Sequence, residues 1–237
     1  MLFVLIALVV FFGVVVHSML GFGVALITMS LLLRILSPTE AAAFVAMFTL
    51  PLQLVIIWRY HDALTLRPIW HLILSSVIGI PVGVALLSIL SEQIILTALA
   101  LFLIGYALYS LLNLNLPEIR HPGWGFGFGL LSGILSGAYN TGGPPLVIYG
   151  TARRWSPEQF KANLQALFTI NGVLVLIAHI AAGHVDALVL ENALIALPVI
   201  AVGAALGFWL SHRVNEALFR KAVLILLLLI GVRLLLP

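Results

Sequence analysis

Long runs of apolar residues, separated by short clusters of charged and turn-forming residues, divide the chain into eight blocks. Two blocks, residues 1–36 and 123–152, are too long for a single span. A straight helix over residues 1–36 would reach about 54 Å, against a hydrocarbon core of about 30 Å. Glycine-rich stretches interrupt both long blocks. The pattern therefore predicts two broken segments and six ordinary membrane spans at residues 39–58, 69–90, 93–116, 160–182, 187–210 and 217–236.

Composition indicates a multi-pass membrane protein with one integral membrane domain. The chain is 63% hydrophobic and 8% charged, with a mean hydropathy of +1.23, whereas a soluble domain carries about 25% charged residues. We expect a cell membrane location, most simply the plasma or inner membrane of a bacterium. The absence of cysteine excludes thiolate chemistry, and no paired histidines at helical spacing and no Ser/His/Asp set are present. We therefore expect no enzyme, no cofactor, no metal and no nucleic-acid partner.

The two halves of the chain resemble each other. Three features repeat at one offset of 119 residues: Gly23 with Gly142, Arg34 with Arg153, and Ser37-Pro38 with Ser156-Pro157. This spacing predicts a first repeat over residues 1–116 and a second over 121–237. Each repeat opens with a glycine-broken segment, a plan that is typical of transporters.

The distribution of Lys and Arg tests two topologies, because cytoplasmic loops collect these residues. If all eight blocks cross the membrane once, the eleven basic residues divide seven against four. If both long blocks are hairpins, only Arg34 and Arg233 lie on one side. Nine then share the other: Arg59, Arg67, Arg120, Arg153, Arg154, Lys161, Arg213, Arg220 and Lys221. This favours two hairpins, each followed by three transmembrane helices, in inverted repeats with both termini outside the cytoplasm.

The second break, residues 140–145, predicts a binding site. Proline suits the first turn of a helix, where no amide hydrogen is needed. Gly142 and Gly143 would expose N–H groups at a helix N-terminus, which is a natural anion site, and Asn140 and Thr141 add side-chain donors. A tight turn without a ligand is the alternative. Upstream, Ser132 and Ser136 are expected to bond to carbonyls of their own helix. The glycines recurring every four residues form a face for helix packing: Gly125, Gly129, Gly133 and Gly137.

The first break offers a counterpart over residues 17–23. His17, Ser18, Gly21 and Gly23 are its candidate site residues. Two facing half-helix N-termini would make a positive pocket without a buried Lys or Arg. His17 as a packed, hydrogen-bonded histidine is the alternative.

A polar residue in mid-span adds one more candidate. Asn171 lies near the middle of its block, where an unpartnered amide is costly and often functional. Gln53 roughly mirrors Asn171 and Gly172 in the other half. Hydrogen bonding between helices is the alternative role for Asn171.

Residues 129–145, Gly-Leu-Leu-Ser-Gly-Ile-Leu-Ser-Gly-Ala-Tyr-Asn-Thr-Gly-Gly-Pro-Pro, resemble the second-repeat signature of the TauE/SafE family of membrane permeases, the sulfite exporter family. The whole length and the duplicated plan match as well. Two departures stand out: residues 21–24 read Gly-Phe-Gly-Val where the family often has a Gly-Gly pair, and Asn-Thr precedes the second Gly-Gly. The resemblance implies transport of a small anion such as sulfite, another sulfur oxyanion or an organosulfonate.

The carboxylates bear on the direction of transport. All eight lie at or near block ends, which leaves no mid-membrane proton relay: Glu40, Asp62, Glu92, Glu118, Glu158, Asp186, Glu191 and Glu216. An anion that leaves a negative-inside cell gains about 2.3 kcal/mol per charge per 100 mV, so export needs no coupling ion. We therefore expect an anion exporter whose partners are its small anionic substrate and the lipid bilayer. An anion channel and a non-transporting accessory membrane subunit are the alternatives.

Overall fold

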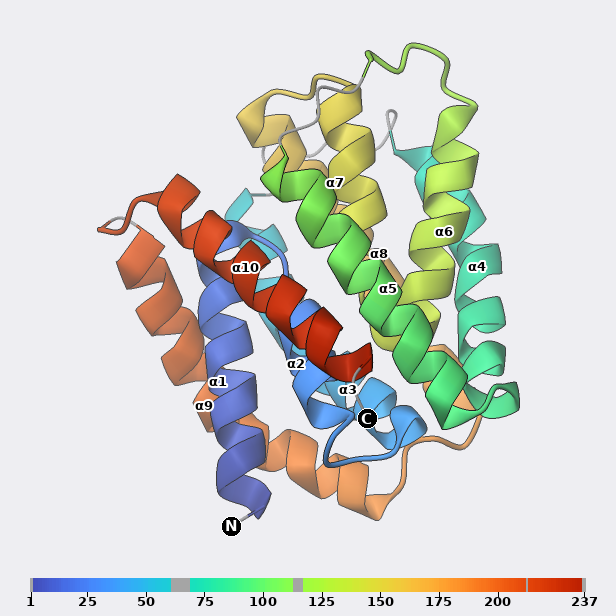
Figure 1. Ribbon diagram of the computed structural model, residues 1–237, viewed down its shortest axis with the longest axis vertical. Coiled ribbons are helices and arrows are strands. Elements are labelled where there is room, and N and C mark those ends of the chain that lie inside the picture. The colour runs from blue at the N-terminus through green and yellow to red at the C-terminus, as the bar shows by residue number, and fades with distance from the viewer. Residues whose placement is uncertain (1, 61–68, 113–116, 212, 236–237) are drawn as a thin grey trace.

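The computed structural model describes residues 2–60, 69–112, 117–211 and 213–235, and over these ranges the chain is helical throughout, with short connecting loops (Figure 1). The predicted all-α fold is confirmed. The helices are α1 (Leu2–Leu20), α2 (Val24–Leu32), α3 (Pro38–Tyr60), α4 (Trp70–Ile89), α5 (Glu92–Leu111), α6 (Trp124–Tyr139), α7 (Gly143–Ala152), α8 (Pro157–Ala181), α9 (Ala187–Ser211) and α10 (Glu216–Leu235).

Helices α1 and α2 form a hairpin. Gly13 in the middle of α1 lies against α2, where a Cβ added to it would stand 2.6 Å from Thr28 Cγ2 and 3.3 Å from the Val24 carbonyl oxygen. In one straight helix these residues would lie about 16 Å or more apart. The first long block therefore folds back on itself, as the charge distribution predicts.

Helices α6 and α7 form a second hairpin. The rings of Phe128 and Tyr149, 21 positions apart in sequence, have centroids 5.5 Å apart. The Ser132 hydroxyl donates to the carbonyl of Gly142 across the turn, at 2.8 Å. The expectation that Ser132 bonds to its own helix is therefore wrong, because the hairpin brings a carbonyl of the turn within reach of its hydroxyl.

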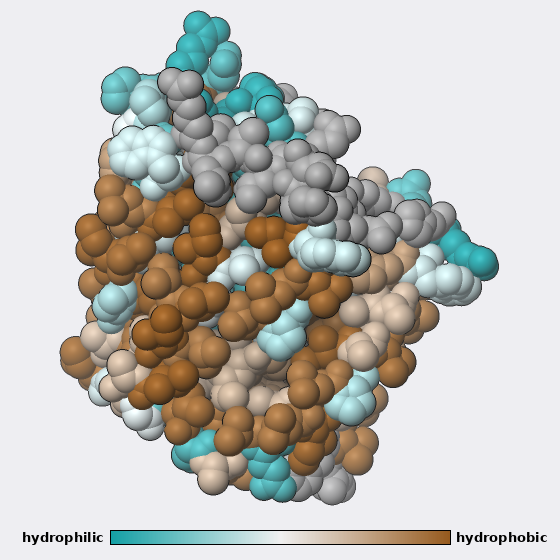
Figure 2. Space-filling view, turned by 180° about the vertical axis from the view of Figure 1, so that it is seen from behind, coloured by the Kyte–Doolittle hydropathy of each residue, from teal (hydrophilic) through white to brown (hydrophobic). Residues whose placement is uncertain are grey.

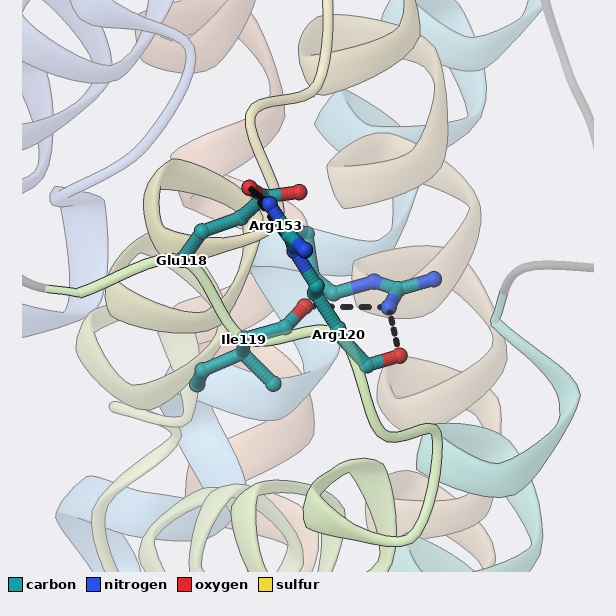
Figure 3. A network of polar contacts seen from close by, with 4 residues as sticks. All are labelled: Glu118, Ile119, Arg120 and Arg153. Carbon is teal, nitrogen blue, oxygen red and sulfur yellow. Dashed lines mark hydrogen bonds and ion pairs between the residues drawn. The ribbon is translucent and has the colours of Figure 1, made fainter.

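The helix ends gather at two opposite faces of the molecule. On the face that we call basic, Arg153 at the end of α7 donates to the carbonyl oxygens of Ile119 and Arg120, at 3.0 and 2.8 Å (Figure 3). On the opposite face, which we call terminal, Arg34 donates to the carbonyl of Arg233 near the end of α10, at 2.9 Å. Both termini lie towards this end, in the lower half of Figure 1. Arg67, which the charge count assigns to the basic side, lies outside the described residues.

An apolar belt separates the two faces. Figure 2 shows a broad hydrophobic band on the rear surface, with hydrophilic residues gathered above and below it. Within the described ranges, five helices are long and apolar enough to cross a membrane: α3, α4, α5, α8 and α9. Helix α10, the sixth predicted span, has 20 residues and packs against α5. The chain is a multi-pass membrane protein.

The helices pack crosswise between the two halves of the chain. The long arm of each hairpin lies against a long helix of the other half, so that α1 packs on α9 and α6 packs on α4. The remaining long helices also pair between the halves, α3 with α8 and α5 with α10. The first hairpin enters from the terminal face and the second from the basic face (Figure 1). This arrangement is the one that inverted repeats would produce. Homology between the halves, and the repeat limits 1–116 and 121–237, stay predictions.

Glycine lets the backbones of α4 and α6 touch. A Cβ on Gly133 would stand 2.6 Å from the Ser76 carbonyl oxygen and 3.0 Å from Gly79 Cα. Gly129 meets Leu72 in the same way. These approaches are too close for any side chain, so the glycine repeat of the second hairpin is a packing face, as predicted.

Candidate functional site

The two hairpin turns face each other across one small cavity of about 40 Å³. This volume holds a few water molecules or one small anion. Five helices and both turns supply its lining: His17, Phe22, Gly23, Val24, Ala25, Leu26, Thr49, Gln53, Asn140, Thr141, Gly143, Pro144 and Phe168. Five predicted site residues are thereby brought together from both halves of the chain: His17, Gly23, Asn140, Thr141 and Gly143.

Two helix N-termini point at this cavity. Helix α2 begins at Val24, directly after Gly23, whose φ of 103° suits glycine because it has no Cβ. Helix α7 begins at Gly143. The first amides of a helix have no intrahelical acceptor and carry the positive end of its dipole. Both half-helices therefore direct partial positive charge into the cavity.

The two N-termini differ in the donors they offer. The first turn of α2 contains Val24, Ala25 and Leu26, each with an amide hydrogen. In the first turn of α7, Pro144 and Pro145 have none, so Gly143 supplies the one amide there. The backbone amide donors at the cavity therefore come mainly from α2.

Buried polar atoms without hydrogen-bond partners also face the cavity. His17 is 2% exposed and neither ring nitrogen has a partner, and Thr141 is 2% exposed with an unpartnered hydroxyl. The Gln53 side-chain oxygen is likewise unpartnered. Each such atom costs about 1–3 kcal/mol when left unsatisfied. Four such atoms, on three side chains that line one cavity, indicate that it holds a polar ligand or water.

Asn140 shapes the second turn. Its φ of 55° places it in the left-handed region that asparagine tolerates. Its side-chain nitrogen donates to the carbonyl of Ala42 on α3, at 2.8 Å. Asn140 thus lines the cavity while its amide donor is used for a contact between the two halves.

Two predicted residues of the first turn lie outside the cavity lining. The carbonyl of Gly21 accepts a hydrogen bond from the Gln165 side chain at 2.7 Å. Ser18 packs on α9, where its Cβ would stand 2.6 Å from a Cβ on Gly207. A direct role of Ser18 and Gly21 in binding stays a prediction.

Two predicted residues of the second half also lie outside the lining. Gly142 backs onto α6, where a Cβ would stand 2.6 Å from the Ser132 carbonyl oxygen. The Asn171 side-chain oxygen accepts from Ser76 on α4 at 2.7 Å, although its side-chain nitrogen is buried without a partner. Bonding between helices, the alternative for Asn171, is therefore observed, and its pathway role stays a prediction.

Sequence reasoning missed the contributions of the two long helices that flank the turns. Thr49 and Gln53 lie four residues apart on one face of α3, and Phe168 comes from α8. The Phe168 ring lies 6.4 Å from that of His17, centroid to centroid. A signal existed for Gln53, because the repeat pairs it with Asn171 and Gly172. The side-chain oxygen of Gln53 indeed lies against Gly172.

The charges and dipoles around the cavity determine which sign of ion it favours. The described residues that line it include no carboxylate, lysine or arginine. Its field is therefore set by the two half-helix N-termini and by neutral dipoles, which favour an anion over a cation. For the whole set of described residues, no group of three or more metal-ligating side chains is present.

Comparison with known proteins agrees with this geometry. The family model for the sulfite exporter TauE/SafE matches residues 5–234. The chain belongs to the TauE/SafE family. A curated relative of this family, the probable sulfite/organosulfonate exporter TauE of Cupriavidus necator, is 30% identical over 177 residues, or 71% of this chain and 69% of the relative. No solved structure matches the chain.

Membership in the TauE/SafE family makes the chain a membrane transporter rather than an enzyme. The match extends over both hairpins and nearly every helix. The family assignment therefore covers the cavity together with the helices that enclose it.

Proposed function

We propose that this protein exports a small anion, a sulfur oxyanion such as sulfite or a small organosulfonate, through the cavity between the two hairpins. The Cupriavidus relative, a probable sulfite/organosulfonate exporter, supports this substrate class. The observation that carries the proposal is the placement of two unpartnered buried side chains, His17 and Thr141, where two half-helix N-termini meet.

The cavity offers a coherent set of donors for an oxyanion. The first-turn amides of α2 and that of Gly143 donate from opposite sides, and the Thr141 hydroxyl adds a further donor. A ring nitrogen of His17 completes the set. The described lining residues include no fixed cation, which favours release of the anion on the far side.

Export follows from the charge of the substrate. We assign the basic face to the cytoplasm, since Lys and Arg collect there. An anion that crosses from this face to the terminal face moves down the electrical gradient of a negative-inside cell, with about 2.3 kcal/mol per charge per 100 mV. The cavity lining contains no acidic side chain in its described part that would serve a coupling cation.

The Thr141 hydroxyl gives a direct test. Purified protein in liposomes is assayed for uptake of radiolabelled sulfite with and without an imposed potential. Thr141→Val removes a buried donor at constant volume, and we expect a fall in transport of about tenfold. Thr28→Val is the matched control. Thr28 is equally buried, but its hydroxyl donates to the Val24 carbonyl of its own helix, and it does not line the cavity.

Four results would count against the proposal. Equal transport by the Thr141 variant and wild type would remove the cavity from the pathway. Indifference to voltage would contradict electrogenic export. Turnover near the diffusion limit would favour an anion channel, and no flux of any sulfur anion would favour an accessory subunit.

A further inference from the structure

The two hairpin turns close in the same way at equivalent positions. Gly21 and Asn140, which are 119 residues apart, both adopt positive φ, at 78° and 55°. The amide of Gly21 donates to the carbonyl of His17 at 2.7 Å, and that of Asn140 donates to the carbonyl of Ser136 at 2.8 Å. The two donors, Gly21 and Asn140, are 119 residues apart, and so are the two acceptors, His17 and Ser136. This is the same offset that relates Gly23 to Gly142.

Each of these turn residues is also bonded to the other half of the chain. The Gln165 side chain on α8 donates to the carbonyl of Gly21, at 2.7 Å. The Asn140 side chain donates to the carbonyl of Ala42 on α3, at 2.8 Å. The turn of each hairpin is thus tied to the first long helix that follows the opposite hairpin. The Gln165 side chain is 2% exposed, whereas Gly21 is partly buried.

The two bonds lie on opposite sides of the cavity. Helix α3 starts at the terminal face, and Ala42 precedes the cavity residue Thr49 by about 10 Å along it. Helix α8 starts at the basic face, and Gln165 precedes the cavity residue Phe168 by about 4.5 Å. The Asn140–Ala42 bond therefore lies towards the terminal face and the Gln165–Gly21 bond towards the basic face.

We propose that these crossed bonds are the two gates of the cavity, Gln165–Gly21 on the basic side and Asn140–Ala42 on the terminal side. Helices α3 and α8 carry cavity residues, so release of one bond lets one hairpin turn separate from the opposite helix and opens the cavity to one face. The other bond stays closed meanwhile. Gln165, which does not line the cavity, is on this account a positioning residue. The proposal rests on the proposed function for its cargo, but its test does not.

Accessibility labelling measures each gate directly, because the chain contains no cysteine. Ala25→Cys places one thiol in the cavity at the N-terminus of α2, where thiols are reactive. An anionic, membrane-impermeant methanethiosulfonate is then applied to membrane vesicles of each orientation. Gln165→Met removes the basic-side donor at similar length. Asn140→Gly removes the terminal-side donor and keeps a residue that accepts positive φ.

We expect each variant to open one face. Gln165→Met should raise the labelling rate from the basic face about two- to tenfold and leave the terminal face unchanged, and Asn140→Gly should do the reverse. Ser76→Ala is the control. It breaks the buried Ser76–Asn171 bond, which also joins the two halves but does not border the cavity, and it should change neither rate.

The outcomes separate the gates from the cargo. Faster labelling from the same face in both variants, no change in either, or an equal rise in Ser76→Ala would overturn the proposal. Labelling from opposite faces in a protein that carries no sulfite would support the gates and reject the substrate. Size-exclusion chromatography and thermal unfolding of each labelled variant confirm that the rates are those of folded protein.

Discussion

The two hairpins have the same shape but supply different chemistry. The first turn contains glycines at both positive-φ positions, Gly21 and Gly23, and places the buried His17 beside the cavity. The second turn has a single positive-φ residue, Asn140, followed by the Thr141 hydroxyl and a half-helix whose prolines remove amide donors. One turn contributes backbone donors and an imidazole, and the other contributes side-chain donors. Two turns of equivalent geometry therefore present different donor groups to the cavity.

The long arms of the hairpins are held differently as well. In the second hairpin, glycines of α6 face the backbone of α4. For the first hairpin, the glycines at this contact lie on the neighbouring helix α9. There Gly203 and Gly207 pack against α1. The second arm is therefore the more sensitive to any added atom.

The largest effect is expected at the contact between α4 and α6. Gly133→Ala places a methyl group 2.6 Å from a backbone carbonyl that cannot move aside, and overpacking of this kind costs about 1–3 kcal/mol. We expect little folded protein after detergent extraction, as measured by size-exclusion chromatography. Gly127→Ala on the same helix is the control, because no atom lies within 4 Å of the added carbon. A well-folded Gly133 variant would contradict the packing role.

Next in size is the difference between His17 and Ser136, which occupy equivalent positions in the two hairpins. His17→Leu removes a cavity donor, and we expect sulfite transport to fall about tenfold. Thermal stability without ligand should stay the same or rise, since two unsatisfied buried nitrogens are removed. Ser136→Ala, which does not border the cavity, should transport within about twofold of wild type. Equal losses in both variants would show that the two hairpins act alike.

The smallest effect is expected when the first turn is made like the second. Gly21→Asn introduces the residue found at the equivalent position, and its new Cβ would lie 3.8 Å from the Gln165 nitrogen, an ordinary contact. Asparagine tolerates positive φ, so transport should stay within about twofold of wild type in the liposome assay. Gly21→Val, which strongly disfavours this φ, should lose folded protein. A severe defect in the asparagine variant would mean that the two turns are not interchangeable.

The sequence predicts the architecture through a few physical signals. The nine-against-two charge count identifies both hairpins. The recurrence of glycine every four residues around Gly133 identifies a packing face, which lies against α4 in the structure. The facing turns follow from the repeat that pairs Gly23 with Gly142. These features depend on local pattern or on charge, which a sequence carries directly.

The remaining parts of the site depend on helix rotation, which a sequence does not reveal. Thr49 and Gln53 share one face of α3, but a polar face inside a membrane protein can point either to a cavity or to a neighbouring helix, and the sequence does not distinguish the two. The same uncertainty explains Asn171, whose position in mid-span is right but whose side chain turns towards Ser76. Gln165 is not among the predicted site residues, because its hydrogen-bond partner is a backbone carbonyl 144 residues away.

The contact between α4 and α6 also has a mechanical consequence. Two helices that touch through their backbones cannot slide past each other without a clash of main-chain atoms, so they move as one rigid unit. Any motion of the second hairpin that opens the cavity must then bend this hairpin at its turn, between Tyr139 and Gly143, instead of sliding its long arm along α4. The membrane-facing surface of α4 and α6 would keep the same shape throughout the transport cycle, and the surrounding lipid would not have to rearrange there.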